Sequence, residues 1–544
     1  MIRSIALVSC LLLLSGRLLA QQASFTHADT LRGSITPQRA WWDLAFYHLS
    51  VRVEPRDSTL TGSNEIRYRV LKPGQVLQID LQAPMQLLGA EQDGQPLSVR
   101  RDGDAYFITL TKRQQAGRQE AIVVRYTGKP QVAKMPPWEG GLVWSRDATG
   151  AWFIATANQG LGASSWWPCK DHLYDEPDSM AISVTVPDDL MDVSNGRLRR
   201  TTTNADHTRT FDWYVRNPIN NYGVNLNIGH FEHWSEVYAG EKGPLTVDYY
   251  ALPTHGDSAR TQFKQVPLML KAFEHWFGPY PFYEDGYKLV EAPYLGMEHQ
   301  SSVTYGNGFR NGYRGRDLSR TGWGLLWDFI IVHESGHEWF ANNITYKDVA
   351  DMWIHESFTN YSESLFTEYY HGKTAGAQYV IGCRALIRND RPIIGTYNVN
   401  RSGSGDMYYK GGNMLHTIRQ LVGNDETWRG LLRGLNKTFY HQTVTTAQIE
   451  TYMSQQTGLT LKPIFDQYLR DTRIPVFEYR AVKGGFQYRW NRVVAGFQMP
   501  LSVCFDESGP YQRLTPTTQW QTLPASNAKT LTVDANYYVL SQRL

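Results

Sequence analysis

The alternation of apolar and polar residues divides the chain into three parts. Between about residues 22 and 240, short runs alternate with a period of two, as in residues 48–54 and 64–70, and turn residues such as Asp93-Gly94 separate them. A period of two is typical of strands that bury one face. We therefore predict a large antiparallel β domain over residues 21–242.

Helical periodicity replaces this pattern near Arg260. Residues 352–371 place apolar and aromatic side chains on one face at a spacing of four. Thr445 and Gln448 have the spacing of a capping box in front of another helix. We predict a mainly helical domain over residues 243–473.

The period of two returns after residue 474. Residues 477–482 and 501–505 alternate again, and turn residues separate the runs. This pattern predicts a small C-terminal β-sandwich over residues 474–544. The fold class predicted for the whole chain is multidomain α+β.

The first twenty residues have the composition of a secretory signal peptide. Arg3 precedes an apolar run at residues 5–14, and residues 18–20 offer a cleavage site before Gln21. The run is too short to span a bilayer, and no other segment has 18 consecutive apolar residues. Residues 7–10 superficially resemble a lipoprotein box, but leucines follow Cys10, so cleavage is favoured over lipidation. We expect an exported protein without a membrane span, periplasmic or extracellular.

Composition and charge narrow the function classes. The chain has 544 residues with 42% hydrophobic and 19% charged residues, which is typical of globular proteins with several domains. The formal net charge of +2 gives no basis for binding nucleic acid. After cleavage three cysteines remain, so at most one disulfide could form, and buried free thiols are favoured. The oligomeric state is left open.

The strongest chemical signal is the H-E-x-x-H pattern of His333, Glu334 and His337. On a helix, two histidines four residues apart share one face, so both rings can reach one metal ion. Glu334 lies next to the first ligand and can reach a water molecule at the metal. The apolar residues 323–332 in front of the motif predict a buried helix that holds the ligands.

A third ligand is available in Glu356, with eighteen residues between it and His337. Two histidines and one carboxylate leave a fourth position for water, which is the catalytic pattern for zinc. We expect one Zn²⁺ per chain. Glu363 lies seven residues after Glu356 on the same helical face and is the preferred partner for a ligand histidine, with Asp351 a weaker candidate for that role.

These motifs carry a family resemblance. H-E-x-x-H followed by eighteen residues and Glu resembles the gluzincin signature, and its surroundings resemble the M1 family of zinc aminopeptidases, of the aminopeptidase N type. Four further stretches match that family: F-G-P-Y-P-F at 277–282, L-G-M-E-H at 295–299, Y-Y-K-G at 408–411 and T-A-N-Q-G at 156–160. The resemblance implies a saddle-like N-terminal β domain, a thermolysin-like catalytic domain and a short form without the family's large helical C-terminal domain.

The resemblance also implies roles for individual residues. Glu298 and Gln159 would bind the free α-amino group of a peptide substrate, and Tyr408 would donate its hydroxyl to the developing oxyanion. Glu334 would act as general base toward the attacking water. The expected function is a zinc-dependent aminopeptidase that removes N-terminal residues from peptides by metal-activated water attack.

Alternatives stay open at this point. One is a bifunctional aminopeptidase and epoxide hydrolase, and another is a non-catalytic peptide-binding scaffold; an endopeptidase is disfavoured by Glu298. The sequence departs from the family pattern at Ser164, Leu295 and His299, and the preferred N-terminal residue and physiological substrate are not predictable.

Overall fold

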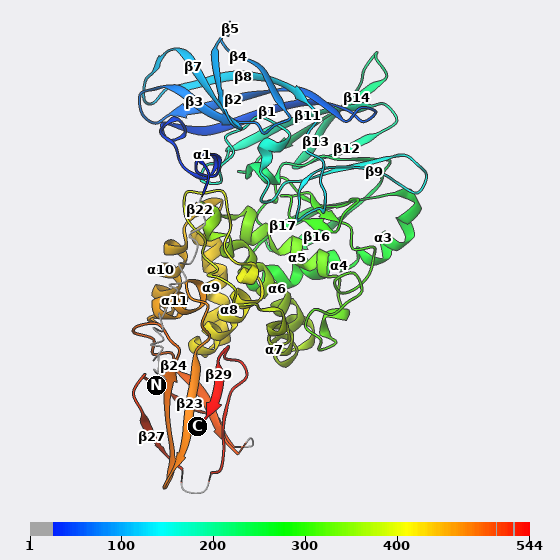
Figure 1. The fold of residues 1–544 in the computed structure, drawn as a ribbon. Coiled ribbons are helices and arrows are strands. Elements are labelled where there is room, and N and C mark those ends of the chain that lie inside the picture. The colour runs from blue at the N-terminus through cyan, green and yellow to red at the C-terminus, as the bar shows by residue number, and fades with distance from the viewer. Residues whose placement is uncertain (1–24, 507–508, 526–527) are drawn as a thin grey trace, which may run out of the picture.

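The computed structural model describes residues 25–506, 509–525 and 528–544. Three regions follow one another along one long axis, with β strands at both ends and helices between them (Figure 1). The predicted α+β class is confirmed by this arrangement. The predicted signal peptide lies outside the described residues.

An eight-stranded sheet, in the order β13-β14-β11-β1-β2-β8-β4-β5, forms the top of the molecule in Figure 1. Most neighbours are antiparallel as predicted, but β1 and β11 pair in parallel. The long stretch of chain between these two strands supplies the crossover that parallel pairing requires. The strands are β1 (Trp42–Glu54), β2 (Thr59–Val70), β4 (Gln86–Gln92), β5 (Gln95–Pro96), β8 (Gln119–Gly128), β11 (Ser179–Pro187), β13 (Arg197–Thr203) and β14 (Thr208–Val215).

Two smaller sheets complete this first region. They are β3 (Gly74–Asp80), β7 (Ala105–Gln114) and β6 (Ser98–Asp102), and β12 (Met191–Val193), β15 (Asn227–Gly229), β10 (Trp152–Ala157) and β9 (Gly141–Arg146). Two short helices, α1 (His27–Gly33) and α2 (Pro37–Ala40), precede β1. The inward side chains of the sheets form one apolar cluster, and β10 leads directly into Gln159.

A five-stranded sheet lies where the first region meets the helices. Its order is β16-β17-β18-β20-β19, from strands β16 (Glu232–Gly240), β17 (Gly243–Ala251), β18 (Tyr287–Glu291), β20 (Val303–Tyr305) and β19 (Gly296–Met297). The predicted boundary between residues 242 and 243 falls inside the β16–β17 hairpin. Because hairpin strands share one ladder, β16 belongs with the middle region.

The helices of the middle region are α3 (Gly256–Gln262), α4 (Gln265–Phe277), α5 (Phe329–Gly336), α6 (Trp353–His371), α7 (Lys373–Gly382), α8 (Tyr409–Val422), α9 (Asp425–Thr438), α10 (Thr446–Thr457) and α11 (Lys462–Leu469). Of these, α4, α5, α7 and α8 pack against α6. Two local predictions are confirmed: α6 stops at Gly372, and Thr445 and Gln448 form a capping box on α10.

Helix α5 starts later than the apolar run before it predicts. Trp323–Leu325 forms a separate 3-10 turn, and the Asp328 side chain then accepts from the backbone N–H groups of Ile330 and Ile331. This cap fixes the first turn at Phe329. The helix ends at Gly336, yet His337 keeps helical angles (φ −66°, ψ −17°), so the four-residue spacing of the histidines is preserved.

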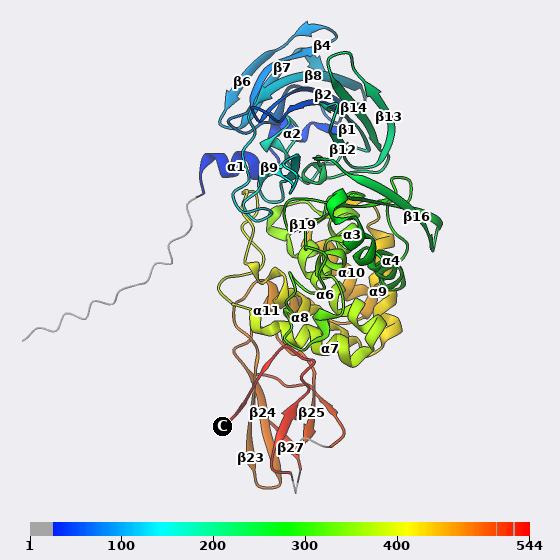
Figure 2. The ribbon, with the colours of Figure 1, turned by 90° about the vertical axis from the view of Figure 1, so that its right-hand side faces the viewer.

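The C-terminal region contains the predicted β-sandwich. One sheet has four strands, β27 (Gln521–Pro524), β24 (Gly485–Asn491), β23 (Val476–Val482) and β29 (Leu540–Arg543); the other has three, β26 (Gln512–Leu514), β25 (Leu501–Phe505) and β28 (Leu531–Val533). It extends from the helices as a narrow lobe (Figure 2). Its apolar core is continuous with that of the helical region.

Neither a disulfide nor a membrane-spanning helix occurs among the described residues. Cys169, Cys383 and Cys504 are buried free thiols, as predicted.

Candidate active site

Helices α5 and α6 bring three predicted metal ligands together. One ligand atom from each of His333, His337 and Glu356 lies within 4.8 Å of the others. The Nε2 atoms of His333 and His337 are 3.9 and 3.5 Å from Oε2 of Glu356. All three side chains are buried, so the cluster lies inside the protein and not on an acidic surface.

The other nitrogen of each histidine ring is already engaged. Nδ1 of His333 lies 2.8 Å from Oε1 of Glu363, and Nδ1 of His337 lies 3.1 Å from the carbonyl oxygen of Phe340. A hydrogen bond at Nδ1 places the proton there and leaves the Nε2 lone pair facing the cluster. The predicted contact between Glu363 and a ligand histidine is therefore present.

The donor set fits a bound zinc ion. Oε2 of Glu356, which faces both histidines, has no hydrogen-bond partner among the described residues. Burial raises the pKa of this carboxyl to about 7, so its environment disfavours an uncompensated negative charge. Two neutral imidazoles and one carboxylate are the ligands that zinc takes in catalytic sites. A cation at this point would satisfy the orphaned oxygen.

The prediction for Asp351 is wrong. Its carboxylate accepts hydrogen bonds from the Tyr397 hydroxyl at 2.6 Å and from the backbone N–H and hydroxyl of Thr446 at 3.1 and 2.6 Å. It therefore anchors the start of α10, while the ligand histidines have other partners. Nothing in the sequence around Asp351 distinguishes a partner of a ligand histidine from a residue that anchors another helix.

Glu334 belongs to a second cluster that shares His337 with the first. One carboxylate oxygen of Glu334, one of Glu298 and one ring nitrogen of His337 form a second set of atoms that lie within 4.8 Å of one another. Burial, followed by the charges of Glu298 and Glu356, holds the pKa of Glu334 well above its usual range. A cation held beside it would offset this repulsion and favour the ionised base.

Glu298 and Gln159 meet beside the metal ligands, although one follows β19 and the other follows β10. Nε2 of Gln159 donates to Oε1 of Glu298 at 2.6 Å and to Oε1 of Glu356 at 3.0 Å. Because both bonds use the amide nitrogen, the amide oxygen of Gln159 is left to accept from a ligand. The geometry thus brings together the two residues predicted to bind an amine.

The Tyr222 side chain is a site residue that the sequence prediction missed. Its hydroxyl donates to Oε1 of Glu298 at 3.1 Å from the short turn Asn221–Gly223. The two residues are far apart in the chain, and a tyrosine between an asparagine and a glycine in a turn carries no signal for this contact. Tyr222 fixes which oxygen of Glu298 remains free.

Tyr408 lies directly before α8 and faces the ligands. The charge of the Glu356 carboxylate acts on its hydroxyl, and its ring centroid is 6.1 Å from that of His333. Burial raises the pKa of this phenol well above its usual range, so it stays protonated and can donate. The Ser357 hydroxyl donates to the carbonyl oxygen of Met407 at 2.6 Å and so ties this segment to α6.

Replacing Glu363 with Gln should weaken zinc binding about ten- to a hundredfold, because His333 loses its anionic partner. A competition titration with a chromophoric chelator measures this affinity. The matched control is Tyr379→Phe, which removes a different bond to Glu363, from the Tyr379 hydroxyl at 2.7 Å, and keeps the one to His333. Equal zinc affinity in Glu363→Gln and the parent protein would contradict this role.

Comparisons with known proteins agree with this geometry. Residues 269–468 match the family model described as "Peptidase family M1 domain". Endoplasmic reticulum aminopeptidase 1 of Rattus norvegicus is 23% identical over 304 residues, which cover 53% of this chain and 32% of that protein. Tricorn protease-interacting factor F2 of Thermoplasma acidophilum is 20% identical over 412 residues, covering 73% and 49%. The chain thus spans a third to a half of the length of these relatives.

Solved structures show the same fold. An M1 zinc metallopeptidase from Deinococcus radiodurans superposes with a TM-score of 0.66 at 22% identity, and the match covers 80% of this chain and 95% of that one. The residues matched by the family model include α5, α6 and Tyr408. The family model, the relatives and the shared fold therefore agree that residues 269–468 are similar to the peptidase domain of family M1.

Proposed function

We propose that the protein is a zinc-dependent aminopeptidase that removes residues from the free N-termini of peptides. The observation that carries this proposal is the position of Glu298 and Gln159, which are hydrogen-bonded to each other beside His333, His337 and Glu356. A carboxylate and an amide oxygen next to the hydrolytic centre recognise an ammonium group. Recognition of that group places the first peptide bond at the centre.

The proposed roles in hydrolysis follow from the side chains. One Zn²⁺ per chain, held by His333, His337 and Glu356, would supply a Lewis acid that lowers the pKa of water. Glu334 takes the proton of the attacking water and passes it to the departing amine. The Tyr408 hydroxyl donates to the carbonyl oxygen as negative charge develops there.

The comparisons support a peptide as substrate. Several relatives are named aminopeptidases, and a structure of the Deinococcus radiodurans protein is described as bound to Tyr-Ser-Ala substrate. For this chain we also propose export, on the basis of the apolar run near its start. A non-catalytic scaffold is less well supported, since the ligand set, Glu334 and Tyr408 are all in place, and no observation favours an epoxide hydrolase.

The test is hydrolysis of aminoacyl fluorogenic amides, measured before and after dialysis against a chelator. We expect cleavage of substrates with a free amine, loss of activity after chelation and recovery when zinc is added. N-acetylated versions of the same amides should resist cleavage. Cleavage of acetylated and free substrates at equal rates would contradict the aminopeptidase assignment.

Replacing Glu298 with Ala should raise KM for free-amine substrates, because the ammonium loses its charged partner. A charge-assisted hydrogen bond is worth about 1.5–3 kcal/mol, so we expect KM to rise about ten- to a hundredfold. The control is Tyr222→Phe, which keeps the carboxylate and removes only the bond that orients it. A KM in Glu298→Ala equal to that of the parent would contradict this role.

A further inference from the structure

A cavity of about 60 Å³ lies beside the proposed amine site. Tyr222, one of its walls, is the residue that donates to Glu298, and Gly160, another wall, directly follows Gln159. Tyr346 forms a third wall, and the charges of Glu298 and Glu356 act on its hydroxyl. Three sides of the cavity therefore border the groups proposed to hold the substrate amine.

We propose that this cavity receives the side chain of the substrate's N-terminal residue and that Lys347 selects an acidic one. The proposal rests on the aminopeptidase function proposed above. The α-carbon of the N-terminal residue carries both the ammonium group and the side chain. With the ammonium at Glu298 and Gln159, the side chain must enter a space that borders these residues, and this cavity does so.

The charge of the cavity favours an anion. Lys347 lies in the wall of the cavity and directly follows β21 (Ile344–Tyr346) in the chain. Its backbone N–H donates to the carbonyl oxygen of Val444 at 2.8 Å. The side chain is half-buried, and among the described residues none forms a hydrogen bond or ion pair with its ammonium group. A partly desolvated cation without a partner gains most from an anionic ligand.

The other charged groups of the wall largely compensate one another. The Arg32 guanidinium lies 3.4 Å from Asp171 and donates to the carbonyl oxygen of Leu161 at 2.7 Å. Asp171 also accepts from the Ser164 hydroxyl at 2.5 Å. Burial lowers the pKa of His172, in the same wall, to about 3, so its ring is neutral. Lys347 supplies the remaining charge.

The size of the cavity fits a short acidic side chain. A volume of about 60 Å³ equals the share of liquid volume of about two water molecules, which leaves room for a carboxylate group. The rings of Phe, Tyr and Trp are larger than this space. Gly162 keeps the wall close, since a Cβ atom there would lie 2.4 Å from the Arg32 guanidinium and from Asp171.

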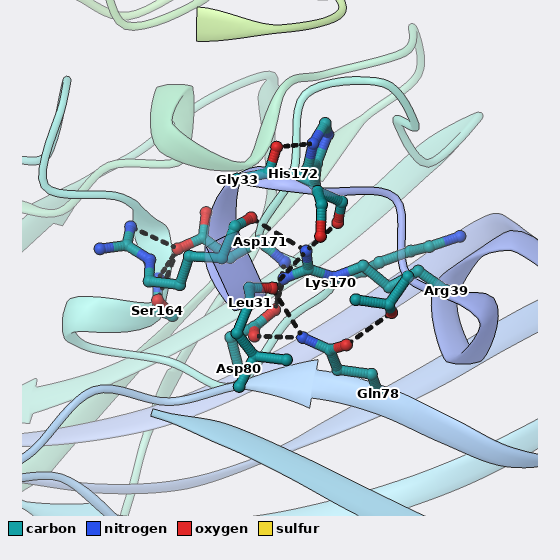
Figure 3. A network of polar contacts seen from close by, with 12 residues as sticks. Leu31, Gly33, Arg39, Gln78, Asp80, Ser164, Lys170, Asp171 and His172 are labelled. Carbon is teal, nitrogen blue, oxygen red and sulfur yellow. Dashed lines mark hydrogen bonds and ion pairs between the residues drawn. The ribbon is translucent and has the colours of Figure 1, made fainter. Parts of the chain in front are cut away.

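One wall of the cavity is held rigidly by the network in Figure 3. Arg39 donates to the carbonyl oxygens of Leu31, Arg32 and Ser34 and to Asp80, while His172 lies 3.3 Å from the carbonyl oxygen of Gly33. These bonds fix α1 against the segment that bears Asp171 and His172. A preformed wall discriminates between ligands better than one that must be ordered on binding.

The test compares aminoacyl fluorogenic amides of Glu, Asp, Ala, Leu and Lys on the full zinc-loaded protein. These amides have no free C-terminal carboxylate. A preference for the Glu or Asp amide must therefore come from recognition of the carboxylate in the substrate side chain. We expect kcat/KM for the Glu amide to exceed that for Leu. Lys347→Met should lower kcat/KM for the Glu amide about tenfold and keep kcat/KM for the Ala amide within about twofold of the parent protein. Lys347→Glu should shift the preference toward the Lys amide.

The matched control is Lys437→Met, at an exposed lysine on α9, which should change neither value. Zinc content and melting temperature of each variant show that it is folded and loaded. Cleavage of Ala and Leu amides in preference to Glu, unchanged by Lys347→Met, would overturn the acidic preference and leave the aminopeptidase function standing. Cleavage of none of the amides by the zinc-loaded parent would instead contradict the proposed function itself.

Discussion

Replacing Glu334 with Gln should lower kcat about a hundred- to ten-thousandfold while the protein keeps its zinc. The amide has the shape of the carboxylate but cannot take a proton from water at neutral pH. Because the proposed metal ligands are His333, His337 and Glu356, the substitution leaves that ligand set intact. Steady-state kinetics with a free-amine fluorogenic substrate measure the loss, and elemental analysis measures bound zinc.

The physical basis of this expectation is the environment of Glu334. Burial of its carboxyl raises the pKa most, and the charges of Glu298 and Glu356 raise it further. A carboxylate whose pKa is raised above its usual range takes a proton from water more readily than an exposed glutamate. Glu334 is not one of the residues proposed to bind the substrate amine. In Glu334→Gln, KM should therefore change much less than kcat.

Two outcomes separate the proposed role from others. A variant that keeps near-normal kcat would show that Glu334 is not the base. A variant that loses zinc in proportion to activity would show that Glu334 acts through the metal site. Glu363→Gln provides the contrast, since there zinc affinity should fall and added zinc should restore much of the turnover.

The parts of the site that could be predicted from sequence are those fixed by local geometry. His333 and His337 are one helical turn apart, and Glu356 and Glu363 are two turns apart on α6, so each pair shares a face once the helix forms. The contact of Glu363 with His333 then needs only that the two helices pack together. The caps of α6 and α10 are local in the same sense, and they too were predictable.

The parts that could not be predicted depend on contacts between distant segments. The β16–β17 hairpin joins the sheet of the middle region because β17 pairs with β18, which begins more than thirty residues after β17 ends. Tyr222 approaches Glu298 only after the first and middle regions have docked. Asp351 serves α10 and not a ligand histidine because Thr446 reaches it from far along the chain. Such pairings leave no periodic trace in a single sequence.

Replacing Arg39 with Met should destabilise the protein by about 3–5 kcal/mol, which would lower the melting temperature of the first region by about 10 °C. Nη2 of Arg39 lies 2.5 Å from Oδ2 of Asp80, and neither side chain is exposed to solvent. Removing the guanidinium leaves the Asp80 carboxylate buried without its cation. Three backbone carbonyls, of Leu31, Arg32 and Ser34, lose a donor as well.

The double variant Arg39→Met with Asp80→Asn distinguishes the buried charge from the lost packing. If the unpaired carboxylate causes most of the loss, the neutral amide should make the double variant more stable than Arg39→Met alone. Arg125→Met, which breaks the exposed pair with Glu91 at 2.8 Å, should change the melting temperature far less, because water screens that pair. Equal melting temperatures for the parent and Arg39→Met would contradict the argument. Since Arg39 also holds α1 in place, its loss should weaken the preference for acidic residues as well as stability. Arg125→Met should leave that preference unchanged.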